Sequence, residues 1–419
     1  MKLFKTINKF ALVIFWIVLI SFIGLLAYVN NTENLITYHY AKNIKKLLKF
    51  KKENLLPRLL NDYNNTFLPE TQFINLKFNK NKLNFLELNG CWIEECYTFY
   101  IERFENNIIL IDKKGNLYYS NINDFLNKKK NAFRRIKSNL NFISVSDLYI
   151  KEENIYVSGY KKLDNNNYYT SIYKSSLNSL NEIDFKEIFK AKNNECIFAP
   201  AHAGKMKHLN NNNFNGLLFT TRWIGVTDKP DVKGLSDNNI CGKILLINEE
   251  TLDYEIFSKG HRNIIGLYTD NDLIIATENG PAGGDEINKI LFNKNYGWPL
   301  ASYGDKYFRD KSVDKINYKK NHKLNNFEEP IFSFIPSIGI SEIIKLPNNF
   351  ANFWQDNFLI GSLNKKILYR VKFDEQFSKI IYLEEIFIGD RIRDILYLEN
   401  EKIILLSLEM SGAIGIIKK

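Results

Sequence analysis

Three arginines stand at the start of apolar runs in the C-terminal half of the chain. Arg262 lies in GHRNIIGLY (260–268), and Arg391 and Arg393 lie in GDRIRDILY (389–397). Guanidinium groups hold planar anions through paired hydrogen bonds. If the fold brings these runs together, the arginines could bind a multiply anionic ligand. The alternative is that each arginine forms a salt bridge to a neighbouring blade, if the runs belong to a circular arrangement of sheets.

One loop is unusually rich in glycine, proline and carboxylates. It reads ENGPAGGDEIN (278–288) and is followed by NYGWP (295–299). Its glycines would let backbone carbonyls approach a ligand or a hard cation, and Asp285 and Glu286 add carboxylate oxygens of the kind that Ca²⁺ prefers. The alternatives are that the loop serves turn geometry alone and that Trp298 is a packing residue.

A histidine lies in another glycine-containing loop, earlier in the chain. His202 lies in APAHAGKM (199–206). An imidazole titrates near neutral pH and can serve as a general base. A single histidine can equally be structural, so this motif alone does not establish catalysis.

The elements that must position these residues are short β-strands. From about residue 66 onward, short β runs alternate with polar turns, as in 107–122, 147–160, 267–279 and 394–419, and segments with helical periodicity are absent. Many evenly spaced hairpins over this length predict an all-β fold, a β-propeller of several blades spanning residues 66–419.

The first 65 residues have a different character. Lysines precede an uncharged apolar run at 10–29, which predicts an N-terminal signal anchor or transmembrane helix within residues 1–30. Residues 31–65 form a basic amphipathic stalk that could lie on anionic lipid or pack on the main domain. The lysine cluster at 42–52 opposes an outward-facing C-terminal domain under the positive-inside rule.

Charge and cysteine content limit the possible partners. The formal net charge is +10, but the lysines are scattered among asparagines and form no aromatic-interleaved basic stripe, so we expect no nucleic-acid partner. The four cysteines, Cys91, Cys96, Cys196 and Cys241, are compatible with two disulfides or with buried thiols, and their spacing does not suggest zinc.

Taken together and in this order, the motifs resemble those of the glucose/sorbosone dehydrogenase family, the aldose sugar dehydrogenases that use pyrroloquinoline quinone (PQQ). The resemblance covers about residue 196 to the C-terminus. The motifs that carry it are GKILLIN (242–248), GHRNIIGL (260–267), ENGPAGGDEINKI (278–290), NYGWP (295–299), SYG (302–304), PSIGIS (336–341), FLIGSL (358–363) and RIRDILYL (391–398).

The resemblance implies a six-bladed β-propeller with PQQ at its mouth and an aldose sugar as substrate. It implies that the anomeric carbon is oxidised to a lactone, with His202 taking the hydroxyl proton and the C1 hydride passing to the quinone C5. The electron acceptor is not identified. Together with the cysteines, the resemblance places the propeller in the periplasm or outside the cell, anchored to the membrane.

The resemblance also assigns the remaining site residues. Cofactor contacts are implied for Arg262, Asn263, Ser337, Arg391 and Arg393. Asn279 matches a catalytic polar contact near the substrate, and Asp285 matches a buried carboxylate that supports the catalytic site. The carbonyls of Gly280 and Pro281 match ligands of the Ca²⁺ that polarises the quinone, and Glu286 is assigned to a second, structural Ca²⁺.

The chain departs from the family pattern at several positions. Asn364 stands where the family often has a lysine, Ala201 replaces an acidic residue before the base, and Lys205 replaces an arginine after it. A glycine-rich first-blade motif is not found. These departures motivate two alternatives: a redox-inactive propeller that binds a glycan or a protein, and a metal-dependent lactone hydrolase, for which clear channel ligands are not evident.

Overall fold

A computed structural model describes residues 66–68, 76–90, 95–162, 168–191, 203–223, 234–305 and 318–419. These residues fall in one compact unit. The predicted membrane anchor and stalk lie outside them. Among the residues that the structure describes, no helix is long and apolar enough to cross a membrane.

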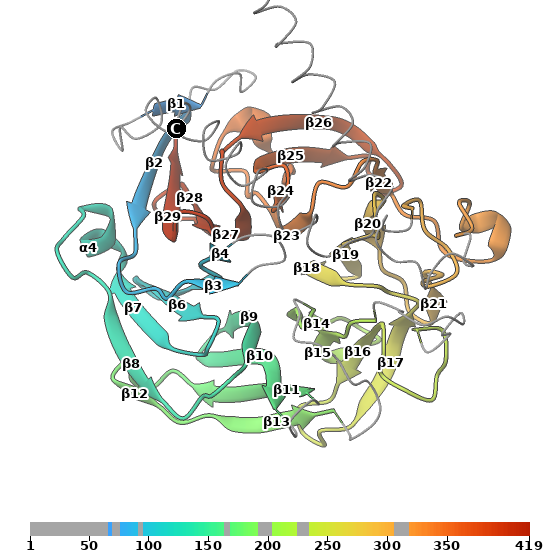
Figure 1. Ribbon diagram of the computed structural model, residues 1–419, viewed down its shortest axis with the longest axis horizontal. Helices are drawn as coiled ribbons and strands as arrows, with labels where there is room; N and C mark the ends of the chain where they lie inside the picture. Colours follow the sequence, from blue (N-terminus) through green and yellow to red (C-terminus); the bar gives the residue numbers. More distant parts are fainter. Residues whose placement is uncertain are drawn as a thin grey trace, which may run out of the picture. The chain divides into compact units, whose positions relative to one another are not determined.

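Six sheets, antiparallel except for the parallel edge strands β12 and β21, are arranged in a ring, which confirms the predicted six-bladed β-propeller (Figure 1). Blade 1 contains β5 (Phe99–Phe104), β6 (Asn107–Asp112), β7 (Leu117–Asn121) and β8 (Arg134–Ser138), with β12 (Glu182–Ile183) at its edge. Blade 2 contains β9 (Ser144–Lys151), β10 (Asn154–Lys162), β11 (Tyr168–Ser176) and β13 (Lys186–Lys190). Blade 3 contains β14 (Met206–Asn210), β15 (Asn215–Thr220), β16 (Lys243–Ile247) and β17 (Tyr254–Lys259), with β21 (Lys294–Asn295) at its edge.

The other three blades follow in chain order. Blade 4 contains β18 (Ile264–Asp270), β19 (Leu273–Glu278), β20 (Asp285–Lys289) and β22 (Phe332–Phe334). Blade 5 contains β23 (Ile340–Lys345), β24 (Phe358–Ser362), β25 (Ile367–Phe373) and β26 (Ile380–Phe387). Blade 6 contains β27 (Ile392–Leu398), β28 (Ile403–Leu408), β29 (Ala413–Lys418), β2 (Leu76–Lys82) and β1 (Thr66–Leu68).

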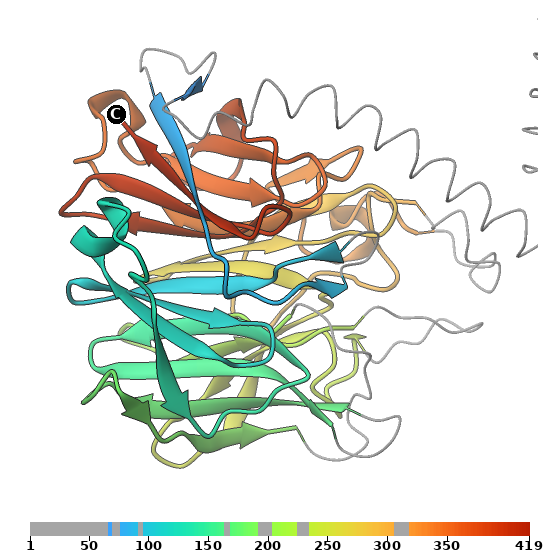
Figure 2. The same ribbon diagram turned by 60° about the vertical axis from the view of Figure 1, so that its left-hand side comes forward.

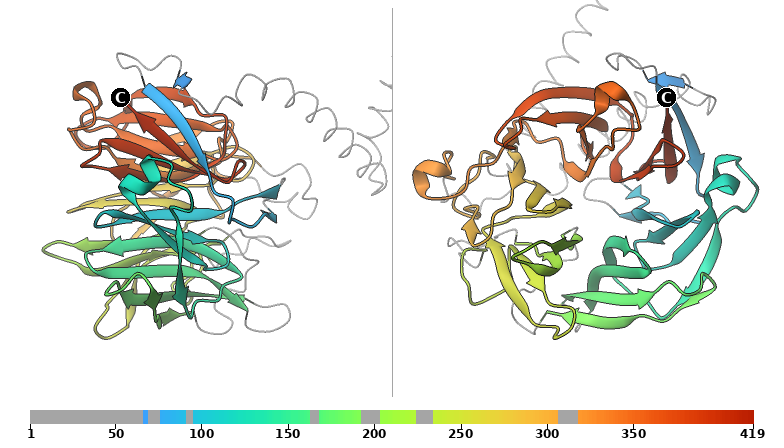
Figure 3. Two further views of the ribbon diagram at one scale, coloured as in Figure 1. Left: turned by 90° about the vertical axis from the view of Figure 1, so that its left-hand side faces the viewer. Right: turned by 180° about the vertical axis from the view of Figure 1, so that it is seen from behind.

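Blade 6 closes the ring because it is built from both ends of the described chain. The strand β2 pairs antiparallel with β29, with Lys77 opposite Lys418 and Lys82 opposite Ala413. The short elements outside the blades are β3 (Asn89–Gly90), β4 (Glu95–Cys96), α4 (Ile122–Leu126), η3 (Lys323–Asn325) and η4 (Asn352–Trp354). The β3–β4 hairpin projects from one face of the disc (Figures 2 and 3).

Apolar layers between neighbouring blades hold the ring together. The strand β28 reads IILLSL and is buried at every position, because adjacent blades cover both of its faces. Leu405 and Ile416 pack against Phe99 of blade 1, whereas Leu406 and Ile417 pack towards blade 5. At the outer edge the pattern changes, and Ile381 and Phe387 of β26 are exposed.

The innermost strands β5, β9, β14, β18, β23 and β27 surround the central axis, each in contact with the next. A buried ammonium group joins three of these blades. Lys205 Nζ lies 2.5 Å from Asp147 Oδ1 of β9 and also forms an ion pair with Glu342 of β23. Blades 2 and 5 are not neighbours in the ring, so this lysine, at the start of blade 3, connects opposite sides of the channel.

Both cysteines that the structure describes, Cys96 and Cys241, are disulfide-bonded. This outcome selects disulfides over buried thiols, the two possibilities that the sequence left open. Their bonding partners lie outside the described residues. Cys96 is next to the start of blade 1, where its Sγ lies 3.6 Å from Thr98 Oγ1.

We expect Lys205→Met to lower the free energy of unfolding by about 3–5 kcal/mol, because it leaves two buried carboxylates without their counter-charge. Although burial opposes its charge, Asp147 and Glu342 raise the pKa of Lys205 well above its usual value. Urea unfolding followed by tryptophan fluorescence measures the loss. The control Lys129→Met removes the exposed pair with Asp124 and should cost less than about 1 kcal/mol. Equal losses in the two variants would contradict the assignment.

A second buried carboxylate predicts a pH dependence. Asp394 accepts hydrogen bonds from Ile101 N at 2.8 Å and Ile395 N at 3.0 Å, and burial raises its pKa to about 7. An unfolded aspartate ionises near pH ~4, so between these values the folded state keeps a proton that the unfolded chain has released. Stability contributed by this group is therefore lost as pH rises from about 4 to 7. The stability difference between wild type and Asp394→Asn should decline across that window, and a constant difference would refute the prediction.

Candidate active site

A narrow pocket lies among the loops of blades 3 and 4. It is lined by Gly260, Arg262, Glu278, Asn279, Gly280, Pro281, Glu286, Tyr296, Trp298, Ala301 and Ser302. Five residues predicted from the sequence are among them. The GHRN motif, the glycine-rich loop and the NYGWP motif therefore meet in space.

The carboxylate of Glu278 shapes the GHRN segment. Its Oε1 accepts hydrogen bonds from Arg262 N and from Asn263 N, the latter at 3.3 Å, and its Oε2 lies 3.1 Å from His261 Nδ1. Only 4% of Glu278 is exposed. Because one buried side chain binds several donors of the segment, the backbone at Arg262 is fixed independently of any ligand.

The guanidinium of Arg262 is held against the pocket wall. Its Nη1 donates to the carbonyl oxygen of Asn279 at 2.8 Å, and its Cζ lies 5.4 Å from the ring centroid of Trp298. The second contact is a cation–π interaction, so Trp298 contacts a predicted site residue besides packing in the core.

The two asparagines of the site bind each other and the next blade. Asn263 Nδ2 lies 3.4 Å from Asn279 Oδ1, and Asn279 Nδ2 donates to Ile340 O at 3.0 Å. The side chain of Asn279 thus connects blade 4 to the inner strand of blade 5. A substrate contact at Asn279 remains a prediction.

Asp285 binds two loops at once. Its Oδ1 accepts from Gly280 N at 3.0 Å and Ser337 Oγ at 2.9 Å, and its Oδ2 accepts from Ile338 N and Ile340 N, both at 3.0 Å. Burial raises its pKa, and these hydrogen bonds oppose the rise. With both oxygens occupied, Asp285 is suited to support the site, as the resemblance implied.

The glycines of this loop allow backbone to pack on backbone. Gly284 has φ +69°, and a Cβ there would lie 2.2 Å from Gly304 N. A Cβ on Gly304 would similarly lie 2.1 Å from Gly283 O. Close contact between two loops therefore explains why glycines stand at 283–284 and in SYG (302–304). Gly280 and Pro281 are the residues of the glycine-rich loop that line the pocket.

Glu286 lies in a buried acidic environment. Burial, and then the neighbouring charge of Glu278, raise its pKa well above the usual value. Asn288 Nδ2 lies 3.3 Å from its Oε2, and His322 Nε2 lies 3.8 Å from its Oε1. The described residues contain no group of three or more His, Cys, Asp or Glu that could hold a metal ion. A cation here would therefore depend on backbone carbonyls as well as on Glu286.

Arg391 and Arg393 form a second cluster, which does not line the pocket. Each donates through Nε to the carboxylate of Glu409, at 3.0 and 2.7 Å, so both arginines form salt bridges, although within blade 6 and not to a neighbouring blade as the alternative anticipated. Arg391 Nη1 lies 3.4 Å from Leu363 O, and Leu363 N donates to Gly339 O. Gly339 lies between Ile338 and Ile340, whose backbone amides bind Asp285. The arginine pair is therefore linked through Leu363 and Gly339 to the glycine-rich loop.

His202 lies outside the described residues, so its role as the base remains a prediction. Sequence reasoning missed Glu278 and Glu409, the two carboxylates that hold the arginine segments. Each ends an apolar β run, as in LIIATE and LLSLE. A lone charge at that position signals a buried partner.

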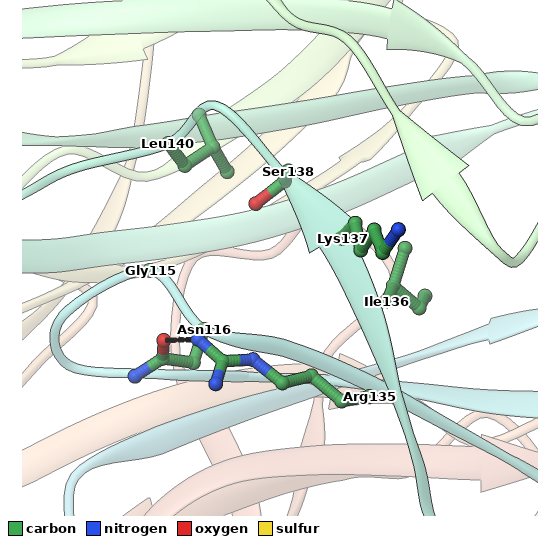
Figure 4. Close-up of a pocket in the computed structure, with 7 residues that line it drawn as sticks. All are labelled: Gly115, Asn116, Arg135, Ile136, Lys137, Ser138 and Leu140. Atoms are coloured by element: carbon green, nitrogen blue, oxygen red, sulfur yellow. Dashed lines mark hydrogen bonds between the residues drawn. The ribbon is translucent and has the colours of Figure 1, made fainter.

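A second pocket lies on blade 1, away from every predicted site residue. It is lined by Gly115, Asn116, Arg135, Ile136, Lys137, Ser138 and Leu140 (Figure 4). Arg135 Nη2 donates to Asn116 Oδ1 at 2.7 Å, and both side chains lie on the protein surface. The pocket contains no acid or base suited to the predicted chemistry.

The fold and the site define a six-bladed propeller with a polar, arginine-bearing site among its loops. Residues 98–416 match the Glucose / Sorbosone dehydrogenase family, and the chain belongs to this family. This match covers more of the chain than the sequence motifs, which begin at about residue 196.

Individual relatives agree. The chain is 34% identical over 153 residues to the aldose sugar dehydrogenase YliI of Escherichia coli, covering 36% of this chain and 40% of that protein. It is 48% identical over 52 residues to quinoprotein glucose dehydrogenase B of Acinetobacter calcoaceticus, covering 12% of this chain and 11% of that protein. The matches span less than half the length of these curated relatives.

The fold is also found in a solved structure. The apo-form of the soluble aldose sugar dehydrogenase of Escherichia coli superimposes with a TM-score of 0.63 at 17% identity, covering 81% of this chain and 99% of that one. At this identity the likeness establishes the propeller fold.

We expect Asp285→Asn to lower the free energy of unfolding by about 2–4 kcal/mol, because an amide keeps one acceptor oxygen where four donors converge. Chemical denaturation measures the loss. Ser337→Ala removes one of the donors and keeps the carboxylate, so it should cost about 1 kcal/mol. If the two variants lost the same stability, Asp285 would not be the group that holds both loops.

Proposed function

We propose that this protein is an aldose sugar dehydrogenase that uses PQQ and Ca²⁺ to oxidise the anomeric carbon of a sugar to a lactone. Family membership and the activities for which the relatives are named support an oxidoreductase of this type. The observation that carries the proposal concerns Arg391 and Arg393, whose N–H groups are only partly hydrogen-bonded to described residues.

The donor groups of Arg393 fit an anionic cofactor. Its side chain is 2% exposed and its Nε binds Glu409. Its Nη2, also buried, finds no hydrogen-bond acceptor among the residues that the structure describes. A buried guanidinium N–H without an acceptor is costly, and a ligand carboxylate would satisfy it. Arg262, Asn263, Arg391 and Ser337 would complete the contacts to PQQ.

The acidic wall of the pocket fits a hard cation. Gly280 and Pro281 line it, and Glu278 and Glu286 lie close enough for the charge of one to raise the pKa of the other. Oxygen ligands are what Ca²⁺ prefers. Carbonyls of Gly280 and Pro281 would hold the Ca²⁺ that assists the cofactor, and Glu286 would hold a structural one.

Each residue of the site then has a separate role in the proposed reaction. When bound, PQQ supplies a two-electron acceptor for the hydride that leaves C1, and Ca²⁺ polarises that acceptor. His202 takes the proton of the anomeric hydroxyl as the hydride leaves C1, so that the bond from C1 to the hydroxyl oxygen becomes a carbonyl double bond and the ring product is a lactone. Asn279 would orient the sugar, and Asp285 keeps the loops of the site in place.

We further propose that the propeller lies in the periplasm or outside the cell, attached by the predicted helix within residues 1–30. The disulfides at Cys96 and Cys241 support an oxidising compartment. An electron acceptor in that compartment must then reoxidise the cofactor.

Calorimetric titration of PQQ into the full chain should show binding that depends on Ca²⁺. Arg262→Leu should weaken it about 10–100-fold, because a charged hydrogen bond contributes about 1.5–3 kcal/mol. Arg103→Leu removes an arginine that binds Glu401 at 3.1 Å in the turn between β27 and β28, at the opposite end of that hairpin from Glu409, and should leave the affinity unchanged.

His202→Ala should bind PQQ normally and lose PQQ-dependent dye reduction with aldoses. Full activity in this variant would show that another group is the base. Absence of PQQ binding by folded protein in the presence of Ca²⁺ would instead favour a propeller that binds a glycan or a protein without redox chemistry.

A further inference from the structure

The carboxylate of Glu409 is the common acceptor of both arginines in the RIR motif. Arg391 Nε donates to its Oε2 at 3.0 Å and Arg393 Nε donates to its Oε1 at 2.7 Å. Glu409 is fully buried and follows β28 directly. One carboxylate thus fixes the rotation of two guanidinium groups about their side-chain axes.

Glu409 is itself held from two blades. Thr98 Oγ1 of blade 1 donates to Oε1 at 3.0 Å, and Tyr97 N donates to the carbonyl oxygen of Glu409 at 2.7 Å. Within blade 6, Glu409 N donates to Arg391 O at 2.9 Å. With the side chain and both backbone groups bonded, Glu409 cannot turn when a ligand arrives or leaves.

This arrangement decides which edge of each guanidinium is available. Both arginines bind Glu409 through Nε, which leaves the edge formed by Nη1 and Nη2 of each guanidinium for another acceptor. Arg393 Nη2 has no acceptor among the described residues, and Arg391 Nη1 has a long contact of 3.4 Å with Leu363 O. Two cations thus share the carboxylate of Glu409.

We propose that Glu409 is a positioning residue: it holds Arg391 and Arg393 with their Nη edges ready to bind the carboxylates of the cofactor before the cofactor binds. The identity of that ligand rests on the proposed function. The orientation of the arginines does not, because it is a property of the ligand-free protein. Preorganised donors avoid the loss of side-chain freedom on binding, which raises affinity.

The substitution Glu409→Gln tests this role. An amide has one acceptor oxygen in place of two, so one arginine loses its partner and turns. Loss of a supporting partner behind a ligand-binding side chain costs about 10–100-fold in affinity at metal sites, and we expect a similar rise in the Kd for PQQ. If Glu409 acted only through its charge, its removal would strengthen anion binding, so an unchanged or lower Kd would overturn the proposal.

A matched control separates positioning from general stability. Arg370 and Glu384 form a buried ion pair in blade 5, with Nε 2.6 Å from Oε2 and side chains 6% and 8% exposed. Glu384→Gln should lower thermal stability as Glu409→Gln does, yet leave the Kd for PQQ unchanged. If Glu384→Gln raised the Kd as much as Glu409→Gln, a loss of general stability would account for both results and the proposal would fail.

A measurement without PQQ distinguishes failure of the proposal from failure of the proposed function. With ¹⁵N-arginine labelling, the Nε–H groups of Arg391 and Arg393 should exchange slowly with solvent in the ligand-free protein, and the one that loses its acceptor should exchange faster in Glu409→Gln. Slow exchange in a wild type that does not bind PQQ would refute the cofactor and keep the positioning role. Fast exchange in the wild type would overturn the positioning role itself.

Discussion

The site depends on buried carboxylates that bind the protein's own donor groups. Glu278 holds the backbone at Arg262, Asp285 holds the glycine-rich loop against residues 337–340, and Glu409 holds the arginine pair. Each lies at or next to the end of a β-strand and is almost fully buried. Burying a charge is unfavourable unless it is fully hydrogen-bonded, so these carboxylates are stable only when the surrounding loops have this conformation. The same interactions therefore fix the loops and position the groups that a ligand would meet.

The propeller makes this possible because its six inner strands surround a common axis. Each loop is attached to a rigid blade, and Lys205 joins blades 2, 3 and 5 across the channel through Asp147 and Glu342. Channel carboxylates would be expected of a hydrolase that binds a metal. Here Asp147 and Glu342 are neutralised by a lysine instead, so they support the ring. This lysine stands at a position where the resemblance had shown a departure from the family pattern.

The sequence predicted the strands and the propeller, because hairpin periodicity and turn residues are local signals. It also suggested that Arg262, Arg391 and Arg393 converge, whereas Arg262 lines the pocket and Arg391 and Arg393 form a second cluster. It did not predict which carboxylate meets which arginine, since Glu278 and Arg262 are brought together only by pairing of β18 with β19. The close contact between Gly284 and Gly304 was likewise invisible, because it joins loops from separate parts of the chain. The types of the elements could thus be predicted from the sequence pattern, whereas the contacts that support the site depend on tertiary pairing.

The central claim is that the site oxidises C1 of an aldose. The most direct test is to load the full chain with PQQ and Ca²⁺, supply glucose labelled with ¹³C at C1 and an artificial electron acceptor, and follow C1 by ¹³C NMR. The account predicts that the anomeric signals are replaced by those of a lactone and its hydrolysed acid. Persistence of the anomeric signals with a range of labelled aldoses, while PQQ is bound, would contradict it.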